Sequence, residues 1–127
     1  MSVQREGGCQ CGAVRFVAEG APKFIANCHC RSCRKATGAA LSTWVGFQEE
    51  NARWTKGAPS YFASSPGVQR GYCRNCGTPL TFASNRWAGE LHFLAGVFDD
   101  PEGLAPRTEV FTEDALSWAP RLGKEQE

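Results

Sequence analysis

The 127-residue sequence has no long hydrophobic run, no excess of charge of either sign and only two histidines. Its longest apolar stretch, residues 91–98, is much shorter than the roughly 20 residues that a membrane-spanning helix needs. The first eight residues contain no apolar segment of the kind found in signal peptides, so we expect a cytoplasmic protein with no membrane contact. The formal net charge is +1 and the Lys and Arg residues are spread along the chain, which argues against a nucleic-acid partner.

Glycine and proline, in contrast, are frequent, and fourteen Gly and seven Pro divide the chain into short segments. The length suits one domain, which we expect to cover residues 1–127. Apolar and polar residues alternate with a period of two, as is typical of antiparallel strands, most clearly in residues 90–98. The one helical candidate is short, residues 31–36. The further predicted strands cover residues 13–19, 24–27, 41–47, 52–55, 60–63, 68–72, 80–83 and 109–112. The pattern predicts an all-β protein with at most one short helix.

Cysteines stand in three tight clusters along the chain: Cys9 and Cys11; Cys28, Cys30 and Cys33; Cys73 and Cys76. A complete set of disulfides needs an even number of cysteines and an oxidising compartment, whereas zinc sites need neither. Structural zinc sites use four protein ligands, and catalytic sites use three and keep an open position. Seven cysteines therefore suit one site of each kind.

The first and last clusters are interpreted as halves of one structural zinc site. Cys73 and Cys76 form a zinc knuckle, because two cysteines three residues apart can reach one ion around a tight turn, where Gly77 can adopt a positive φ. Cys9 and Cys11 are two residues apart, so both point the same way on an extended strand. The spacing also permits the knuckle to pair with two cysteines of the middle cluster.

The middle cluster, Cys28, Cys30 and Cys33, is predicted to be a catalytic zinc centre where a strand leads into the short helix. Zinc held by three thiolates has a net negative formal charge, so it activates water poorly but accepts a soft ligand such as a substrate thiolate. The spacing leaves two alternatives open. The site could be closed by a fourth protein ligand, or the three cysteines could bind no metal.

Other polar residues lie near this cluster in the sequence, and we do not expect them to be zinc ligands. Arg31, Arg34 and Lys35 are expected to favour thiolates. Toward the substrate two roles stay open: attraction of its carboxylates, or none, since solvated charges on a helix surface are the more common case. His29 should point away from the ion on an extended segment. His92 lies opposite the core face of its strand, so we expect it to be solvated or hydrogen-bonded rather than catalytic.

From Gly8 to Trp118 the chain resembles the glutathione-dependent formaldehyde-activating enzyme family, to which centromere protein V belongs. The resemblance is carried by three ordered motifs: Cys9-x-Cys11-Gly12, Cys28-His29-Cys30-x-x-Cys33-Arg34 and Cys73-x-x-Cys76-Gly77-Thr78-Pro79-Leu80. It implies a β-tent fold of several small antiparallel sheets. It also implies two zinc ions, a structural one on Cys9, Cys11, Cys73 and Cys76 and one associated with activity on Cys28, Cys30 and Cys33.

The activity that the resemblance implies is that of a carbon-sulfur lyase, which forms or cleaves S-hydroxymethylglutathione from glutathione and formaldehyde. We therefore predict a zinc enzyme that acts on a small glutathione-like thiol and an aldehyde. The alternative is a non-catalytic, zinc-stabilised β scaffold that binds a protein. The chain departs from the family at Glu109, which stands where a histidine is common. The sequence carries no signal for an oligomeric state.

Overall fold

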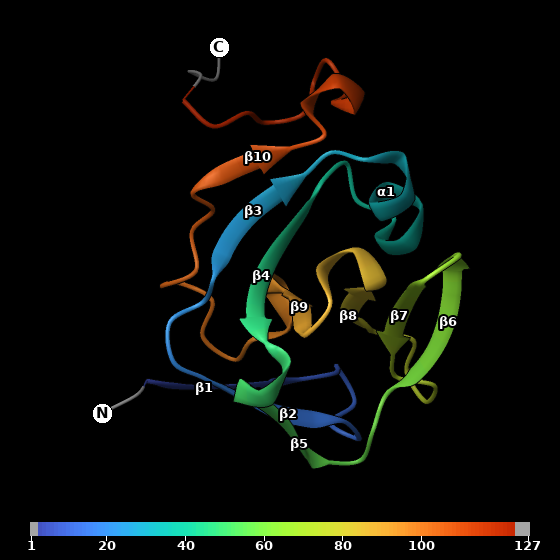
Figure 1. Ribbon diagram of the computed structural model, residues 1–127, viewed down its shortest axis with the longest axis vertical. Helices are drawn as coiled ribbons and strands as arrows, with labels where there is room; N and C mark the ends of the chain where they lie inside the picture. Colours follow the sequence, from blue (N-terminus) through green and yellow to red (C-terminus); the bar gives the residue numbers. More distant parts are fainter. Residues whose placement is uncertain (1–2, 124–127) are drawn as a thin grey trace.

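The computed structural model describes residues 3–123, and these fold into ten strands, one α-helix and several short 3-10 turns (Figure 1). The helix α1 covers Arg31–Thr37. The strands are β1 (Gln4–Gly8), β2 (Arg15–Glu19), β3 (Phe24–Cys28), β4 (Ser42–Gln48), β5 (Ala52–Lys56), β6 (Ser60–Ser65), β7 (Val68–Tyr72), β8 (Pro79–Ser84), β9 (Glu90–Leu94) and β10 (Thr108–Val110). The all-β prediction with one short helix is confirmed. Within the described residues no helix is long and apolar enough to cross a bilayer.

The strands form two sheets in this part of the chain. The small sheet has the order β1-β2-β5, and the large sheet has the order β10-β3-β4-β9-β8-β7-β6. All neighbouring strands are antiparallel except β10, which runs parallel to β3. Figure 1 shows the small sheet lying across one end of the large sheet, with α1 near the opposite end of β3 and β4.

The main hydrophobic core lies between the two sheets. Phe16 and Ala18 on β2 face Val45 and Phe47 on β4 and Phe93 on β9, and all five are buried. The rings of Phe16 and Phe93 stack with their centroids 4.2 Å apart. Burying one such side chain contributes roughly 1.5–3 kcal/mol, so this aromatic contact holds the sheets together.

Two elements differ from the sequence prediction. The strand expected over residues 90–98 ends at Leu94, because Ala95–Val97 form a 3-10 turn that brings Phe98 back into the core. The strand β1 was not predicted, since Gln-Arg-Glu-Gly-Gly has no apolar alternation. It exists because its backbone pairs with β2 over the full length of both strands.

Gly46 on β4 leaves room for the ring of Phe24 on the neighbouring strand, because a Cβ at this position would collide with that ring. We expect Gly46→Ala to destabilise the domain by about 1–3 kcal/mol through overpacking. Urea denaturation would measure the loss. Gly96→Ala is the matched control, since nothing lies within 4 Å of its added Cβ, and an equal effect of both substitutions would contradict the prediction.

Candidate functional site

Four cysteines from two distant turns come together in space. Cys9 and Cys11 lie between β1 and β2, and Cys73 and Cys76 lie between β7 and β8. The four sulfurs lie within 4.8 Å of one another. The Sγ of Cys11 is 3.7 Å from that of Cys9 and 3.8 Å from that of Cys73. A tetrahedral zinc site with Zn–S bonds of about 2.3 Å has S–S edges of about 3.8 Å, so this donor set fits zinc.

The two halves of this four-cysteine cluster reach it by different backbone geometries. The N–H of Gly77 bonds to the carbonyl of Cys73, and Gly77 has φ 83°, as predicted for a knuckle. The prediction that Cys9 and Cys11 lie on an extended strand was wrong. They lie in a tight turn, closed by the N–H of Gly12 on the carbonyl of Cys9, because β1 ends at Gly8.

The four-cysteine cluster does not ionise uniformly. The hydroxyl and the N–H of Thr78 lower the pKa of Cys76 to about 5. The N–H of Cys76 lowers the pKa of Cys73, but burial and the thiols of Cys9 and Cys76 outweigh it and raise that pKa to about 11. A divalent cation at the centre would displace the remaining protons, because it offsets the repulsion between neighbouring thiolates.

The middle cluster forms a second group of sulfurs. Cys28 is the last residue of β3, Cys30 is the N-cap of α1, and Cys33 lies in the first turn of the helix. Their sulfurs lie within 4.8 Å of one another, and no fourth Cys, His, Asp or Glu in residues 3–123 joins them. The structure thus groups the cysteines as four and three, as the spacing favoured. Their role as zinc ligands stays a prediction.

Arg70 reaches this three-cysteine cluster from β7, which lies several strands away from β3 in the large sheet. Its side chain is buried, and its Nη2 donates to Ser32 Oγ at 3.0 Å and to Cys33 Sγ at 3.7 Å. Its Nε donates to Ser64 Oγ at 3.0 Å, and the guanidinium lies over the ring of Phe82. No carboxylate of the described chain forms an ion pair with it. The sulfur cluster is therefore the anionic partner that this buried cation needs.

The surroundings of Cys33 favour its thiolate. The thiol of Cys28 donates to Cys33, and despite the burial of Cys33 a further bond from Cys30 and the charge of Arg70 bring its pKa to about 5. The same contact raises the pKa of Cys28, because its proton is held between two sulfurs. Cys33 is thus the thiol of this cluster whose ionised form the structure favours most, and Arg70 lies beside it.

The three-cysteine cluster opens into a pocket of about 970 Å³, whose wall includes several aromatic rings among small and polar side chains. His92 lines this pocket, with Nε2 2.9 Å from Glu90 Oε1. It is packed against Phe24 and Phe82, and its burial lowers its pKa in spite of Glu90. The hydrogen-bonded state expected for His92 is confirmed, but the sequence did not place it beside the cysteines.

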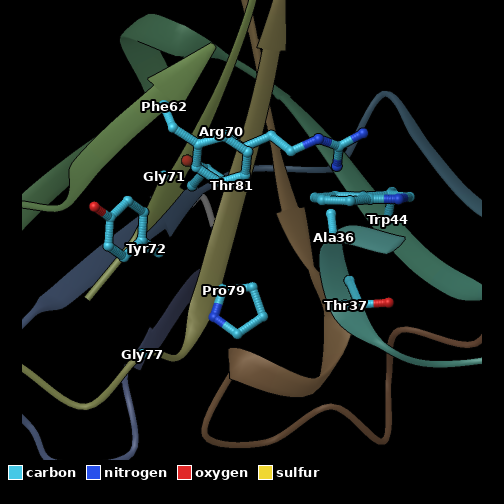
Figure 2. Close-up of a pocket in the computed structure, with 10 residues that line it drawn as sticks. All are labelled: Ala36, Thr37, Trp44, Phe62, Arg70, Gly71, Tyr72, Gly77, Pro79 and Thr81. Carbon is cyan, nitrogen blue, oxygen red and sulfur yellow. The ribbon is translucent and has the colours of Figure 1, made fainter. Parts of the chain in front are cut away.

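A second, smaller cavity of about 230 Å³ lies between α1 and the β7–β8 turn (Figure 2). Arg70 and Trp44 line both this cavity and the large pocket, so their side chains form part of a shared wall. In Figure 2 the Arg70 side chain extends toward Trp44. A change at either residue would therefore alter both spaces.

The basic residues of α1, Arg31, Arg34 and Lys35, do not line the pocket, which agrees with the alternative of solvated helix charges and not with attraction of substrate carboxylates. Arg34 instead donates to the carbonyls of His29 and Asp114 and so holds the C-terminal segment to the helix. Among residues 3–123, the cation that lines the pocket without an ion-pair or side-chain hydrogen-bond partner is Arg86, which the sequence analysis missed; its guanidinium lies 5.1 Å from the centre of the Trp87 ring.

Glu109 faces away from the three-cysteine cluster. Its Oε2 lies 2.6 Å from Nε2 of the fully buried His29 and accepts from Arg121 Nε at 3.0 Å. Its Oε1 accepts from the N–H of Leu122. The glutamate at this position therefore ties β10 to His29 and to the C-terminal segment, and His29 is a core residue as expected.

Glu109→Gln should lower the denaturation midpoint at pH 7. Burial opposes ionisation of Glu109, but hydrogen bonds from His29, Leu122 and Arg121 lower its pKa below the ordinary 4.5. Because the folded pKa is the lower one, this stabilisation is complete above pH 4.5 and is lost as the pH falls through the folded value. Wild-type and variant midpoints should therefore converge in acid. The exposed Glu113→Gln is the control, and a pH-independent difference for Glu109→Gln would contradict the assignment.

The arrangement defines a β protein with two cysteine clusters of metal-site geometry, one closed by four sulfurs and one open to a pocket. Residues 4–114 match the sequence profile of the glutathione-dependent formaldehyde-activating enzymes, and the chain belongs to this family.

Curated relatives and a solved structure agree with this membership. A Schizosaccharomyces pombe protein, named as an uncharacterized lyase, is 28% identical over 109 residues, which cover 86% of this chain and 79% of that protein. A Halomonas elongata protein, provisionally named a glutathione-dependent formaldehyde-activating enzyme, is 30% identical over 133 aligned positions. The alignment covers 96% of this chain and 83% of that protein. A crystal structure of a Rhodobacter sphaeroides protein shares the fold with a TM-score of 0.63 and 17% identity, over 82% of this chain and 98% of that one.

Proposed function

We propose that this protein is a zinc-dependent carbon-sulfur lyase that forms or cleaves the adduct of a small glutathione-like thiol with an aldehyde such as formaldehyde. The observation that carries the proposal is the three-cysteine cluster, which opens into a large pocket and has Arg70 as its buried counter-charge. The family and the names of its relatives support the same chemistry.

The two clusters would divide the metal chemistry between them. Cys9, Cys11, Cys73 and Cys76 would hold a structural zinc, and Cys28, Cys30 and Cys33 a catalytic one. A zinc ion held there would supply an open position for a soft ligand, at which a substrate thiol could be kept as a nucleophilic thiolate. The protein side chains then hold and shield the reacting sulfur.

Each neighbouring group has a defined task in this proposal. Arg70 offsets the negative charge of the sulfur cluster, so that a further anionic sulfur can approach. Trp44 and Phe82 pack against the three-cysteine cluster and shield it from water, which strengthens the charge interactions there. The sulfur attacks the aldehyde carbon, the carbonyl π bond breaks, and the oxygen takes up the proton that the thiol released.

We also propose that the whole chain, residues 1–127, acts as one domain in a reducing cytoplasm. All seven cysteines are free thiols in the structure, which suits that compartment.

The test combines metal analysis with NMR exchange spectroscopy of formaldehyde and glutathione. We expect two zinc ions per chain and faster adduct exchange with the protein than without it. Cys30→Ala should keep one zinc and lose the acceleration, because Cys30 is only half-buried and lies outside the four-cysteine cluster. The proposal fails if no low-molecular-weight thiol gives accelerated exchange. A single zinc in the wild type would favour a protein-binding scaffold instead.

A further inference from the structure

We infer that the aldehyde half of the substrate carries an aromatic ring, so that the site serves a larger and more apolar adduct than that of formaldehyde. This inference rests on the proposed function, because it assigns a substrate class to the same three-cysteine cluster. It is carried by the composition of the pocket wall next to the sulfurs, by its charges and by the residues at its mouth.

The wall nearest the sulfurs is aromatic. Trp44 and Phe82 pack against the three-cysteine cluster, with their ring centroids 5.8 Å apart. The wall continues from Phe82 to Trp87, at 6.1 Å, and to His92, at 5.5 Å. The substituent on the aldehyde carbon lies only two bonds from the reacting sulfur, so it is held close to these rings. Aromatic pairs are stabilised beyond the burial of their area, which favours a ring at this place.

The size of the pocket agrees with a large substituent. Formaldehyde has two heavy atoms and fills about 60 Å³, roughly twice the liquid share of a water molecule. The pocket measures about 970 Å³, which is in the range of sites for drug-sized ligands. The pocket therefore has room for a tripeptide thiol together with a substituent larger than the hydrogen atom of formaldehyde.

The charges place the polar half of the substrate at the mouth. Apart from the three-cysteine cluster itself, the charged residues among the described pocket lining are Arg70, Arg86 and Glu90. Arg70 is engaged by Cys33 and two serine hydroxyls, and Glu90 by Lys23 and His92. Arg86 is the cation left for a substrate carboxylate. The carboxylates of a thiol peptide therefore belong beside Arg86, and the space by the cysteines is left for an apolar group.

Three apolar side chains at the pocket are unusually exposed. Trp87, Val110 and Phe111 have exposed fractions of 37%, 40% and 40%. Phe111 has φ 54° and ψ 42°, a left-handed conformation that is strained for a bulky residue. Core packing does not explain such a ring, because it remains in contact with solvent. A bound aromatic group would cover it.

The reaction needs no further reactant. The thiol adds across the C=O bond of the aromatic aldehyde, so a C–S bond forms, the π bond breaks and the thiol proton moves to the oxygen. The product is a hemithioacetal, and the reverse reaction returns the thiol and the aldehyde.

The test compares ligands that differ only at the aldehyde carbon. S-benzylglutathione and S-methylglutathione are unreactive analogues of the aromatic and the formaldehyde adducts, and fluorescence of the pocket tryptophans reports their binding. We expect the benzyl compound to bind at least tenfold more tightly. Trp87→Ala and Phe111→Ala should reduce this preference severalfold. Trp118→Ala, at a 73% exposed ring that does not line the pocket, should leave it unchanged.

Exchange rates with benzaldehyde and with formaldehyde separate this inference from the proposed function. Accelerated exchange that favours benzaldehyde supports both. Exchange with formaldehyde alone, or equal binding of the two analogues, overturns the aromatic assignment and leaves the lyase function standing. Exchange with neither aldehyde overturns the lyase function and, with it, the inference.

Discussion

Cys73→Ser should unfold the domain under conditions in which the wild type is folded. Cys73 is buried and belongs to the four-cysteine cluster, which joins the β1–β2 turn of the small sheet to the β7–β8 turn of the large sheet. Structural zinc contributes about 10–16 kcal/mol in small domains, which is as large as the total stability of about 5–15 kcal/mol. Far-UV circular dichroism and urea denaturation would measure the loss.

A strong chelator should have the same effect on the wild type, and added zinc should reverse it. The matched control is Cys30→Ser, which removes a sulfur from the other cluster and should leave the fold intact. A Cys73→Ser protein with the denaturation midpoint of the wild type would disprove the structural role of this cluster.

The second large effect concerns Cys33 and its partner Arg70. Cys33→Ala should lower the lyase activity by about 100-fold or more, since the open cluster then has only two sulfurs. It should also destabilise the fold by about 3–5 kcal/mol, because Arg70 is only 4% exposed and loses the sulfur that it contacts. Activity assays and urea denaturation would measure the two losses separately.

A second substitution tests the cause of this instability. Arg70→Met in the Cys33→Ala background should recover most of the stability, because it removes the unpaired buried charge, and none of the activity. Cys30→Ala is the comparison, since it breaks the cluster without removing a partner of Arg70. Equal denaturation midpoints for Cys33→Ala and Cys30→Ala would contradict the assigned charge pairing.

The features that could be predicted from the sequence are those that local spacing determines. The knuckle at Cys73 and Cys76 follows from a three-residue step and the glycine after it, and the all-β class follows from the period of two. Both depend on residues close together in the chain. The pairing of β1 could not be predicted, because it comes from backbone hydrogen bonds to β2 and not from side chains.

The residues that surround the three-cysteine cluster could not be predicted from the sequence. Arg70 and His92 come from strands that follow the three-cysteine cluster by many residues, and the order of strands in the large sheet brings them to it. The sequence did contain one signal for Arg70. Arg70 lies two residues from both Val68 and Tyr72, so the three side chains share one face of the strand, and that face is otherwise apolar. A charged residue in such a place needs an anion nearby. For Glu109 the sequence suggested a role that the structure does not show. Its position in the family pattern pointed to the three-cysteine cluster, but its side chain contacts His29.

One strand connects the two clusters. Arg70 reaches Cys33 from β7, and only three residues later the chain enters the four-cysteine cluster at Cys73. A strand rises about 3.3 Å per residue, so Arg70 and Cys73 are joined by a short, extended segment. The position of Arg70 along the sheet therefore depends on how firmly Cys73 is held. A substitution that loosens the turn at Cys73 would therefore also move Arg70 away from Cys33, so damage at the closed cluster would reach the open one through β7.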